Sequence, residues 1–233
     1  PLGNVGHLVQ IPRAALKKIL RAKPVIVTVY TLEKAREISA VCTELGLHQK
    51  LMLRVLGEGD MLYSGQYGGF ELQELDSAVR AIEAMPNVEV GGVCSFPCFL
   101  YDEAAQDILP MTNLRTVQTA AEMLRARGYR DLMLNTPSAT CTHSIPMIAA
   151  AGGTHGEPGH GLTGTTPYHA GHPDAEERPG YLYVSEVSHN LGDKAYCYGG
   201  GHYRRGHMKN ALVGTTPENA KVVPVLPPDD SSI

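Results

Sequence analysis

Tryptophan is absent from this sequence of 233 residues, phenylalanine occurs only three times, and no apolar run is long enough to cross a membrane. The sequence also shows no pattern of a signal peptide, a lipidation motif or a basic tail, and we expect none of them. The 20 lysine and arginine residues are scattered among 24 acidic residues, so the net charge of −4 leaves no basic surface for nucleic acid. We therefore expect neither a membrane nor a nucleic-acid partner.

Cysteine is scarce, and its five residues are odd in number and irregularly spaced. This pattern is typical of reduced thiols in the cytoplasm rather than of a disulfide framework. Cys94 and Cys98 are close enough to form half of a metal site, but no second pair follows them. We interpret both as buried thiols and expect no metal.

Ten histidines keep a metal-dependent barrel hydrolase open as an alternative. No pair of them has the HExxH spacing that places two ligands on one helix face. His169 and His172 lie in a segment rich in proline and glycine, which also disfavours a rigid metal site.

Strand-like and helix-like patterns alternate through the first two-thirds of the chain. Strands are expected at 7–10, 25–29, 51–56, 88–93, 132–134 and 154–157, with helices between them. This alternation predicts an α/β fold with a parallel sheet. An open doubly wound sheet is possible, but polar residues cluster after the C-terminal ends of several strands, as in a (β/α)8 barrel. We favour a barrel whose first two β/α units are missing.

The amino-acid composition and the pattern of expected helices and strands change at Pro167. Residues 1–166 are expected to form the barrel part, and residues 167–180 a linker rich in histidine, proline and glycine. Short strand-like segments without helices follow, so 181–233 is expected to begin a mostly β domain. The sequence starts at proline and has no natural ending, so we expect it to be an excerpt of a longer protein.

The segment 157–164, Glu-Pro-Gly-His-Gly-Leu-Thr-Gly, carries the clearest chemical signal. Its turn offers the backbone amides of Gly159, His160 and Gly161, together with the Thr163 hydroxyl, to one anion such as a phosphate. The carboxylate of Glu157 suits a protonated ring nitrogen on the same ligand. Pyridoxal 5'-phosphate (PLP) has both groups, although a plain surface turn is the alternative.

Three further residues are candidate cofactor contacts. Ser138 and Thr140 lie in the loop after the preceding strand, where their hydroxyls could also serve as turn or helix caps. His7 lies near the end of an early strand. A buried histidine with a backbone partner is an equally good interpretation.

Four segments carry a family resemblance: 6–12, 135–140, 157–164 and 196–207. They resemble the alanine-racemase-like, fold type III family of PLP enzymes, and more narrowly its YhfX-like branch. The resemblance implies a PLP-binding barrel, a β domain and a homodimer. It also implies a lysine at the end of the first barrel strand that binds the cofactor covalently.

No lysine in this sequence occupies such a position: Lys17, Lys18, Lys34 and Lys50 fall on helices or loops, and Lys23 lies at the wrong end of a strand. The missing lysine agrees with the two missing β/α units. We therefore expect the isolated chain to be catalytically inactive.

The resemblance also implies roles for single residues. Glu157 matches the glutamate that contacts the pyridine nitrogen in the decarboxylases of this fold, where alanine racemase carries arginine. Tyr198 matches a tyrosine base supplied across the dimer interface, and Arg204 and Arg205 are candidates to hold the substrate carboxylate. Two departures are Ser95, where the family commonly has histidine, and Gln66, where racemases often have arginine.

The leading hypothesis is a PLP-dependent enzyme that acts at Cα of an amino acid, and within this class a racemase. A decarboxylase or lyase of the same fold comes next, because a carboxylate at the ring nitrogen favours electron withdrawal by the ring. A non-catalytic PLP-binding protein for cofactor homeostasis is the alternative from another class.

Overall fold

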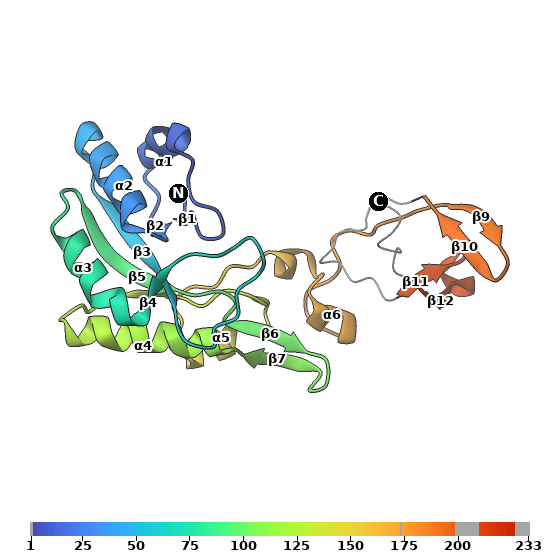
Figure 1. The fold of residues 1–233 in the computed structure, drawn as a ribbon. Helices are drawn as coiled ribbons and strands as arrows, with labels where there is room; N and C mark the ends of the chain where they lie inside the picture. Colours follow the sequence, from blue (N-terminus) through green and yellow to red (C-terminus); the bar gives the residue numbers. More distant parts are fainter. Residues whose placement is uncertain (1, 173, 199–209, 227–233) are drawn as a thin grey trace. The chain divides into compact units, whose positions relative to one another are not determined.

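The computed structural model describes residues 2–172, 174–198 and 210–226 (Figure 1). The chain forms two compact units, and the division between them in the sequence falls between Gly180 and Tyr181. The segment expected to be a linker, 167–180, belongs to the first unit and contains the short helix α6 (Pro167–Gly171).

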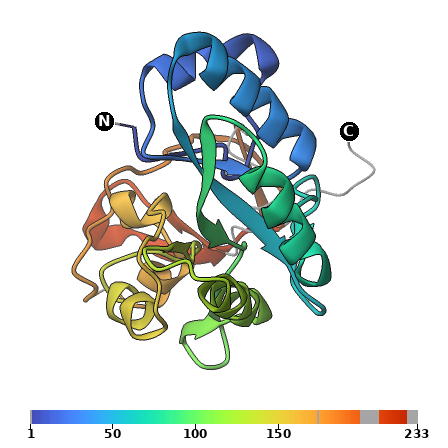
Figure 2. The same cartoon turned by 90° about the vertical axis from the view of Figure 1, so that its left-hand side faces the viewer.

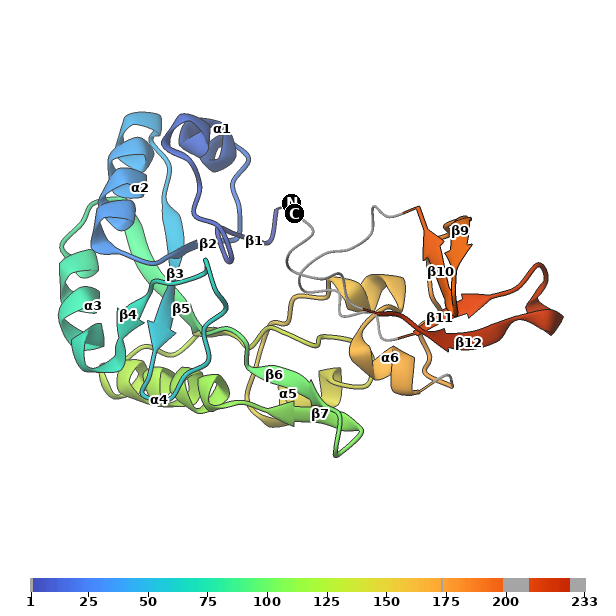
Figure 3. The same cartoon turned by 45° about the vertical axis from the view of Figure 1, so that its right-hand side comes forward.

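A parallel sheet forms the centre of the first unit (Figure 3). Its strand order is β1 (Asn4–Val5), β2 (Ile26–Val29), β3 (Gln49–Leu56), β5 (Val88–Cys94) and β8 (Met133–Asn135), and β4 (Phe70–Glu71) also pairs with β3. Every pair in this sheet is parallel. The β-branched run that predicts a strand at 25–29 forms β2, whose residues are all buried. The predicted α/β class is confirmed.

Helices cover one face of this sheet, and Figure 2 shows α2, α3 and α4 together on one side of the strands. The helices are α1 (Leu16–Arg21), α2 (Leu32–Leu45), α3 (Leu75–Glu83), α4 (Thr112–Ala126) and α5 (Ile145–Ala150). The bounds of α2 follow from its sequence. The Thr31 hydroxyl accepts from the backbone N–H of Lys34 at the start, and Gly46 ends the helix in the left-handed conformation.

The two edges of the sheet meet through side chains. At one edge, β1 carries Asn4. At the other edge, His155 forms a parallel bridge with Asn135 of β8, and Glu157 follows two residues later. Asn4 Nδ2 donates to Glu157 Oε1 at 3.0 Å. In a flat sheet, strands about 4.8 Å apart would separate these edges by roughly 24 Å, too far for two side chains. The sheet is therefore curled like the wall of a barrel, as the sequence predicts.

Alternate strand residues pack into different clusters. Val27 and Leu53 belong to the main core, which the helices cover. Their neighbours Ile26 and Met52 form a separate small cluster with Cys94. Because side chains alternate across a strand, this second cluster faces the inside of the curl. Part of the inner surface of the curled sheet is therefore apolar and consists of Ile26, Met52 and Cys94.

The predicted strand at 7–10 is wrong. The strand is Asn4–Val5, and the chain turns at Gly6, whose φ is +90°. The side chain of Gln10 then replaces backbone pairing, because its Nε2 donates to the carbonyl groups of Gly6 and Thr28 at 2.9 and 3.0 Å. The apolar appearance of 7–10 therefore reflects a loop held against β2.

Two other segments differ from expectation. The expected strand at 154–157 pairs through only the bridge at His155. Sequence patterns also miss an antiparallel hairpin of β6 (Phe99–Asp102) and β7 (Asp107–Pro110). The Asp102 carboxylate accepts from the backbone N–H groups of Ala104 and Ala105, and this Asx-type turn is the signal that marks the hairpin.

The second unit contains two antiparallel pairs among its described residues, β9 (Val187–Leu191) with β10 (Lys194–Cys197) and β11 (Asn210–Val213) with β12 (Lys221–Pro224). The first of these strands begins at Val187, six residues after the start of the expected β domain at Tyr181. In the described parts of both units, no helix is long and apolar enough to span a membrane.

Gly92 tests how tightly the sheet is packed. A Cβ atom at Gly92 would lie 2.2 Å from the carbonyl oxygen of Met133, so β5 and β8 would have to separate. We expect Gly92→Ala to lower the free energy of unfolding by about 2 kcal/mol, as overpacking typically does. Gly3→Ala is the control, because no atom lies within 4 Å of a Cβ there. Urea unfolding measures both variants, and equal stability of the two would contradict the tight contact.

Candidate functional site

Glu157 is held at one carboxylate oxygen and open at the other. Oε1 accepts hydrogen bonds from Asn4 Nδ2 at 3.0 Å and from Asn135 Nδ2 at 2.7 Å. The Thr28 hydroxyl donates to Asn4 Oδ1 at 2.8 Å and so fixes the orientation of that amide. Burial raises the pKa of Glu157, and the two amide hydrogen bonds oppose this rise. The side chain is 33% exposed, so Oε2 remains available to a ligand donor.

His7 lies beside the open oxygen. Its Nε2 is 3.3 Å from Glu157 Oε2, but the geometry is not that of a hydrogen bond, and neither ring nitrogen has another partner. Burial, with a further contribution from the Arg54 charge, lowers the pKa of His7 to about 4. His7 is therefore neutral at pH 7. The Tyr30 hydroxyl donates to the His7 carbonyl group, and Phe96 contacts the imidazole edge-on at 5.5 Å between ring centroids.

Two loops next to Glu157 carry backbone amides without an acceptor. In the described part of the chain, the backbone N–H groups of Gly159, His160 and Gly161 donate to no other group. Among the described residues, the backbone N–H of Ser138 also donates to no other group, and its hydroxyl has no hydrogen-bond partner. The φ of Ser138 is +97°. Such amides are the donors that a phosphate group requires. The Thr163 hydroxyl, in contrast, already donates within its own loop to the His160 carbonyl group at 3.1 Å.

These two loops are packed backbone to backbone. A Cβ atom at Gly161 would lie 2.1 Å from the carbonyl oxygen of Thr140, so only glycine allows this approach. The Thr140 hydroxyl also accepts from the backbone N–H of Glu157 at 3.2 Å. Thr140 therefore positions both the turn and the carboxylate.

Arg54 is the unexpected member of this region. It lies on β3, two residues after Met52 on the inner face, and it is 0% exposed. Its Cζ lies 4.8 Å from the centroid of the Tyr30 ring, yet none of its three side-chain nitrogen atoms has a hydrogen-bond partner of good geometry. A single charge in the apolar run 51–56 was the sequence signal for this residue.

The two departures from the family pattern have different surroundings. Ser95 is buried and accepts from Asn113 Nδ2 at 3.1 Å, and its own hydroxyl lies 3.5 Å from Asp60 Oδ2. These contacts tie the loop after β3 to α4, so Ser95 has a structural role. Gln66 has a buried side-chain oxygen without a partner.

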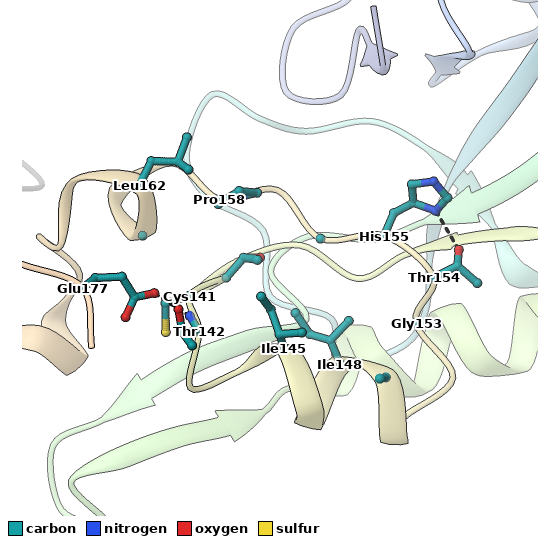
Figure 4. Close-up of a pocket in the computed structure, with 14 residues that line it drawn as sticks. Cys141, Thr142, Ile145, Ile148, Gly153, Thr154, His155, Pro158, Leu162 and Glu177 are labelled. Atoms are coloured by element: carbon teal, nitrogen blue, oxygen red, sulfur yellow. Dashed lines mark hydrogen bonds between the residues drawn. The ribbon is translucent and has the colours of Figure 1, made fainter. Parts of the chain in front are cut away.

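A cavity of about 540 Å³ borders the same two loops (Figure 4). Its lining includes Thr140, Pro158 and Gly161, together with the apolar side chains of Ile145 and Ile148 from α5. It does not include Glu157 or His7. The chemistry therefore lies beside this cavity and not in it.

Cys94 and Cys98, which lie near the site, are both buried. Burial raises the pKa of Cys94 to about 12 and that of Cys98 well above its usual value. Among the residues that the structure describes, no group of three or more histidine, cysteine or acidic side chains could hold a metal ion.

The other sequence-predicted residues lie elsewhere. Tyr198 follows β10 in the second unit and is 62% exposed. Arg204 and Arg205 lie outside the described residues. Of the described lysines, Lys34 bonds to Ile11 and Glu37, and Lys50 is an exposed residue of β3.

Comparison with known protein families places this geometry in context. Residues 5–167 match the model described as alanine racemase, N-terminal domain, and residues 182–233 match the model described as YhfX-like, C-terminal domain. The chain belongs to the alanine racemase N-terminal domain family. This is the PLP-binding family that the sequence resemblance indicates, and its barrel fold agrees with the curled parallel sheet.

One relative of this family member is the uncharacterized protein YhfX of Escherichia coli, with 44% identity over 235 residues. The alignment covers 100% of this chain and 60% of the relative, so the chain spans about three-fifths of that protein's length.

Solved structures of similar shape include PipY from Synechococcus elongatus, with 18% identity, a TM-score of 0.48, and coverage of 64% of this chain and 65% of PipY. Alanine racemase from Clostridium difficile has 18% identity and a TM-score of 0.42, with coverage of 57% of this chain and 32% of the racemase. At these TM-scores the family assignment rests on the sequence match.

The neutral state of His7 predicts a pH dependence of stability. Below its ordinary pKa of 6.5, the unfolded chain binds a proton that the folded chain binds only near pH 4. Stability should therefore fall as the pH drops from 6.5 toward 4, by about 2–3 kcal/mol from this residue. We expect His7→Gln to remove that part of the loss, measured by urea unfolding at pH 7 and pH 4.5. An identical loss in both proteins would mean that His7 is not buried in its neutral form.

Proposed function

We propose that this protein binds PLP and acts at Cα of an amino acid, and that the reaction is racemisation. The observation that carries the proposal is the pairing of one open carboxylate oxygen, Glu157 Oε2, with an adjacent surface of unused backbone amides. A ligand with a protonated ring nitrogen and a phosphate group matches both features. The family assignment independently favours the same cofactor.

The residues present fit PLP. Gly159 has no atom within 4 Å of a Cβ position, so there is open space beside the turn at this residue. Glu157 would hold the ring nitrogen, and the amides of residues 159–161 with Ser138 would hold the phosphate. Bound PLP supplies an electron-accepting ring, and the carboxylate keeps its nitrogen protonated.

Glu157 also supports a second candidate. A protonated ring nitrogen favours strong electron withdrawal, which suits a decarboxylase or lyase as well as a racemase. The name of the matched family model favours racemisation. Binding of PLP without turnover would favour a protein of cofactor homeostasis.

The proposal includes a homodimer and a second catalytic group. The exposed Tyr198 would act as the base on one face of Cα when a partner copy brings it to the site. Because no described lysine lies beside Glu157, the base on the other face would be a lysine of the whole protein. The site of this chain alone would hold PLP but not turn over substrate.

PLP binding is the first test. We expect Glu157→Gln to weaken PLP binding about tenfold, because a charge-assisted hydrogen bond to the ring nitrogen is lost. An absorbance titration with PLP measures the dissociation constant. The control is Glu58→Gln, since Glu58 is exposed on the loop after β3. Equal affinity of all three proteins would contradict the role of Glu157.

Reaction type is the second test. We expect the whole protein with PLP to interconvert one L- and D-pair in a panel of amino acids, detected by chiral chromatography. Tyr198→Phe should slow this interconversion at least ~100-fold, as expected for loss of a general base. Tyr196→Phe, in the neighbouring strand β10, serves as the control. Release of CO₂ in place of the opposite enantiomer would replace racemisation with decarboxylation.

A further inference from the structure

The imidazole of His7 is buried with its hydrogen-bonding groups unused. The side chain is 6% exposed, and among the described residues neither ring nitrogen has a hydrogen-bond partner. Buried polar groups are normally paired, because an unpaired group loses its hydrogen bonds to water without a replacement. A neutral imidazole has one N–H donor and one acceptor nitrogen. His7 therefore has a donor that requires an acceptor close by.

The fold holds His7 in this place through its neighbours. A Cβ atom at Gly6 would lie 2.8 Å from the carbonyl oxygen of Thr28, so only glycine allows the chain to turn this close to β2. The Tyr30 hydroxyl donates to the His7 carbonyl group, and the Phe96 ring contacts the imidazole edge-on. The position of the imidazole is therefore set by the turn before it and by contacts from two other strands' ends.

The acceptor within reach is the open oxygen of Glu157. His7 Nε2 lies 3.3 Å from Glu157 Oε2, so a small rotation of the imidazole would align an N–H at Nε2 with that oxygen. The other oxygen, Oε1, already accepts from Asn4 and Asn135, and these two bonds keep the carboxylate in place. A carboxylate oxygen can accept two hydrogen bonds. Oε2 can therefore accept one from His7 and a second from a ligand.

The other titratable groups around this pair keep one charge state near neutral pH. They are Tyr30 after β2, Arg54 on β3 and Cys94 on β5. Burial raises the pKa of Tyr30, and it raises the pKa of Cys94 to about 12, so both are neutral, while Arg54 stays charged. Burial and the Arg54 charge lower the pKa of His7 to about 4. Between about pH 5 and pH 8, Glu157 is therefore the member of this set that can change its charge.

We infer that His7 turns its Nε2–H toward Glu157 Oε2 and so keeps Glu157 a carboxylate for the ring nitrogen of the ligand. This inference rests on the proposed function and gives His7 a positioning role in it. A hydrogen bond to the charged form of an acid stabilises that form and opposes the effect of burial. Because the imidazole is neutral, it does so without adding a positive charge that would repel the protonated ring nitrogen. A lysine or arginine at this position would compete with the ring for the carboxylate.

The pH dependence of ligand affinity tests the inference. The ligand is pyridoxine 5'-phosphate, which has the ring nitrogen and phosphate of PLP but no aldehyde, so its binding needs no lysine. We expect His7→Leu to match the wild type at about pH 8 and to bind about tenfold more weakly near pH 5, because Glu157 then takes up a proton about one pH unit earlier. Isothermal titration calorimetry measures the dissociation constants. The titration of the ligand itself is common to all proteins, so the ratio to wild type isolates Glu157.

Two further variants complete this experiment. His7→Gln retains an N–H donor near the position of Nε2 and should follow the wild type at every pH. His48→Leu removes an exposed histidine that lies beside Glu89 and is the control for loss of an imidazole. Equal pH profiles for His7→Leu and the wild type would overturn the inference. A loss of affinity that is the same at every pH would also overturn it, since that is the effect of a purely structural histidine.

A measurement on the wild type tests the same inference if His7→Leu does not fold. The ¹⁵N NMR signals of the His7 ring, identified as those missing from His7→Gln, report which nitrogen carries the proton. We expect the proton on Nε2. A proton on Nδ1 would leave no donor that faces Glu157 and would overturn the inference.

The failure of the proposed function can be recognised separately. If the wild-type protein binds neither pyridoxine 5'-phosphate nor PLP, the proposed function fails, and the ligand-free protein still tests the role of His7. The carboxyl ¹³C signal of Glu157, identified as the one missing from Glu157→Gln, gives the pKa of Glu157. We expect His7→Leu to raise this pKa by about one unit and His7→Gln to leave it unchanged. The same pKa in His7→Leu and the wild type would show that His7 does not act on Glu157.

Discussion

The structure depends on one carboxylate that joins both edges of the curled sheet. Asn4 and Glu157 are 153 residues apart in sequence, yet their hydrogen bond brings the first strand against the end of the barrel part. Asn135 donates to the same oxygen from the neighbouring strand. The curvature of the sheet and the orientation of the Glu157 carboxylate therefore depend on the same hydrogen bonds. A change that flattens the sheet would also release Glu157, so fold and site are coupled directly.

Much of the fold follows from local patterns. The buried run at 25–29 and the Thr31 cap with Gly46 could be located because each depends on nearby residues. The segment at 7–10 is a loop and not the predicted strand because its hydrogen bonds come from the side chain of Gln10, which replaces strand pairing. The hairpin of β6 and β7 was missed because its strands are short and its turn is set by Asp102. Side-chain hydrogen bonds of this kind do not change the hydrophobic periodicity of the sequence, so the periodicity does not reveal them.

The candidate site was predictable only in part. Glu157 and the glycine-rich turn could be identified from sequence, because one segment contains both the carboxylate and the amides. The two asparagines that orient Glu157 come from distant strands, so their role depends on the register of the sheet. Arg54 is not among the residues predicted from sequence, although it interrupts an apolar strand. Thr163 seemed available, but its hydroxyl is used within its own turn, which only the three-dimensional structure reveals.

The contact of Gly161 with the Thr140 carbonyl group has a consequence for ligand exchange. Because the two loops already touch through their backbones, little chain freedom remains to be lost when an anion arrives. Association then requires no folding of a loop around the ligand, and its rate is set by diffusion and by access to the site. The lifetime of the bound state, rather than the speed of capture, becomes the property that substitutions in these loops can tune.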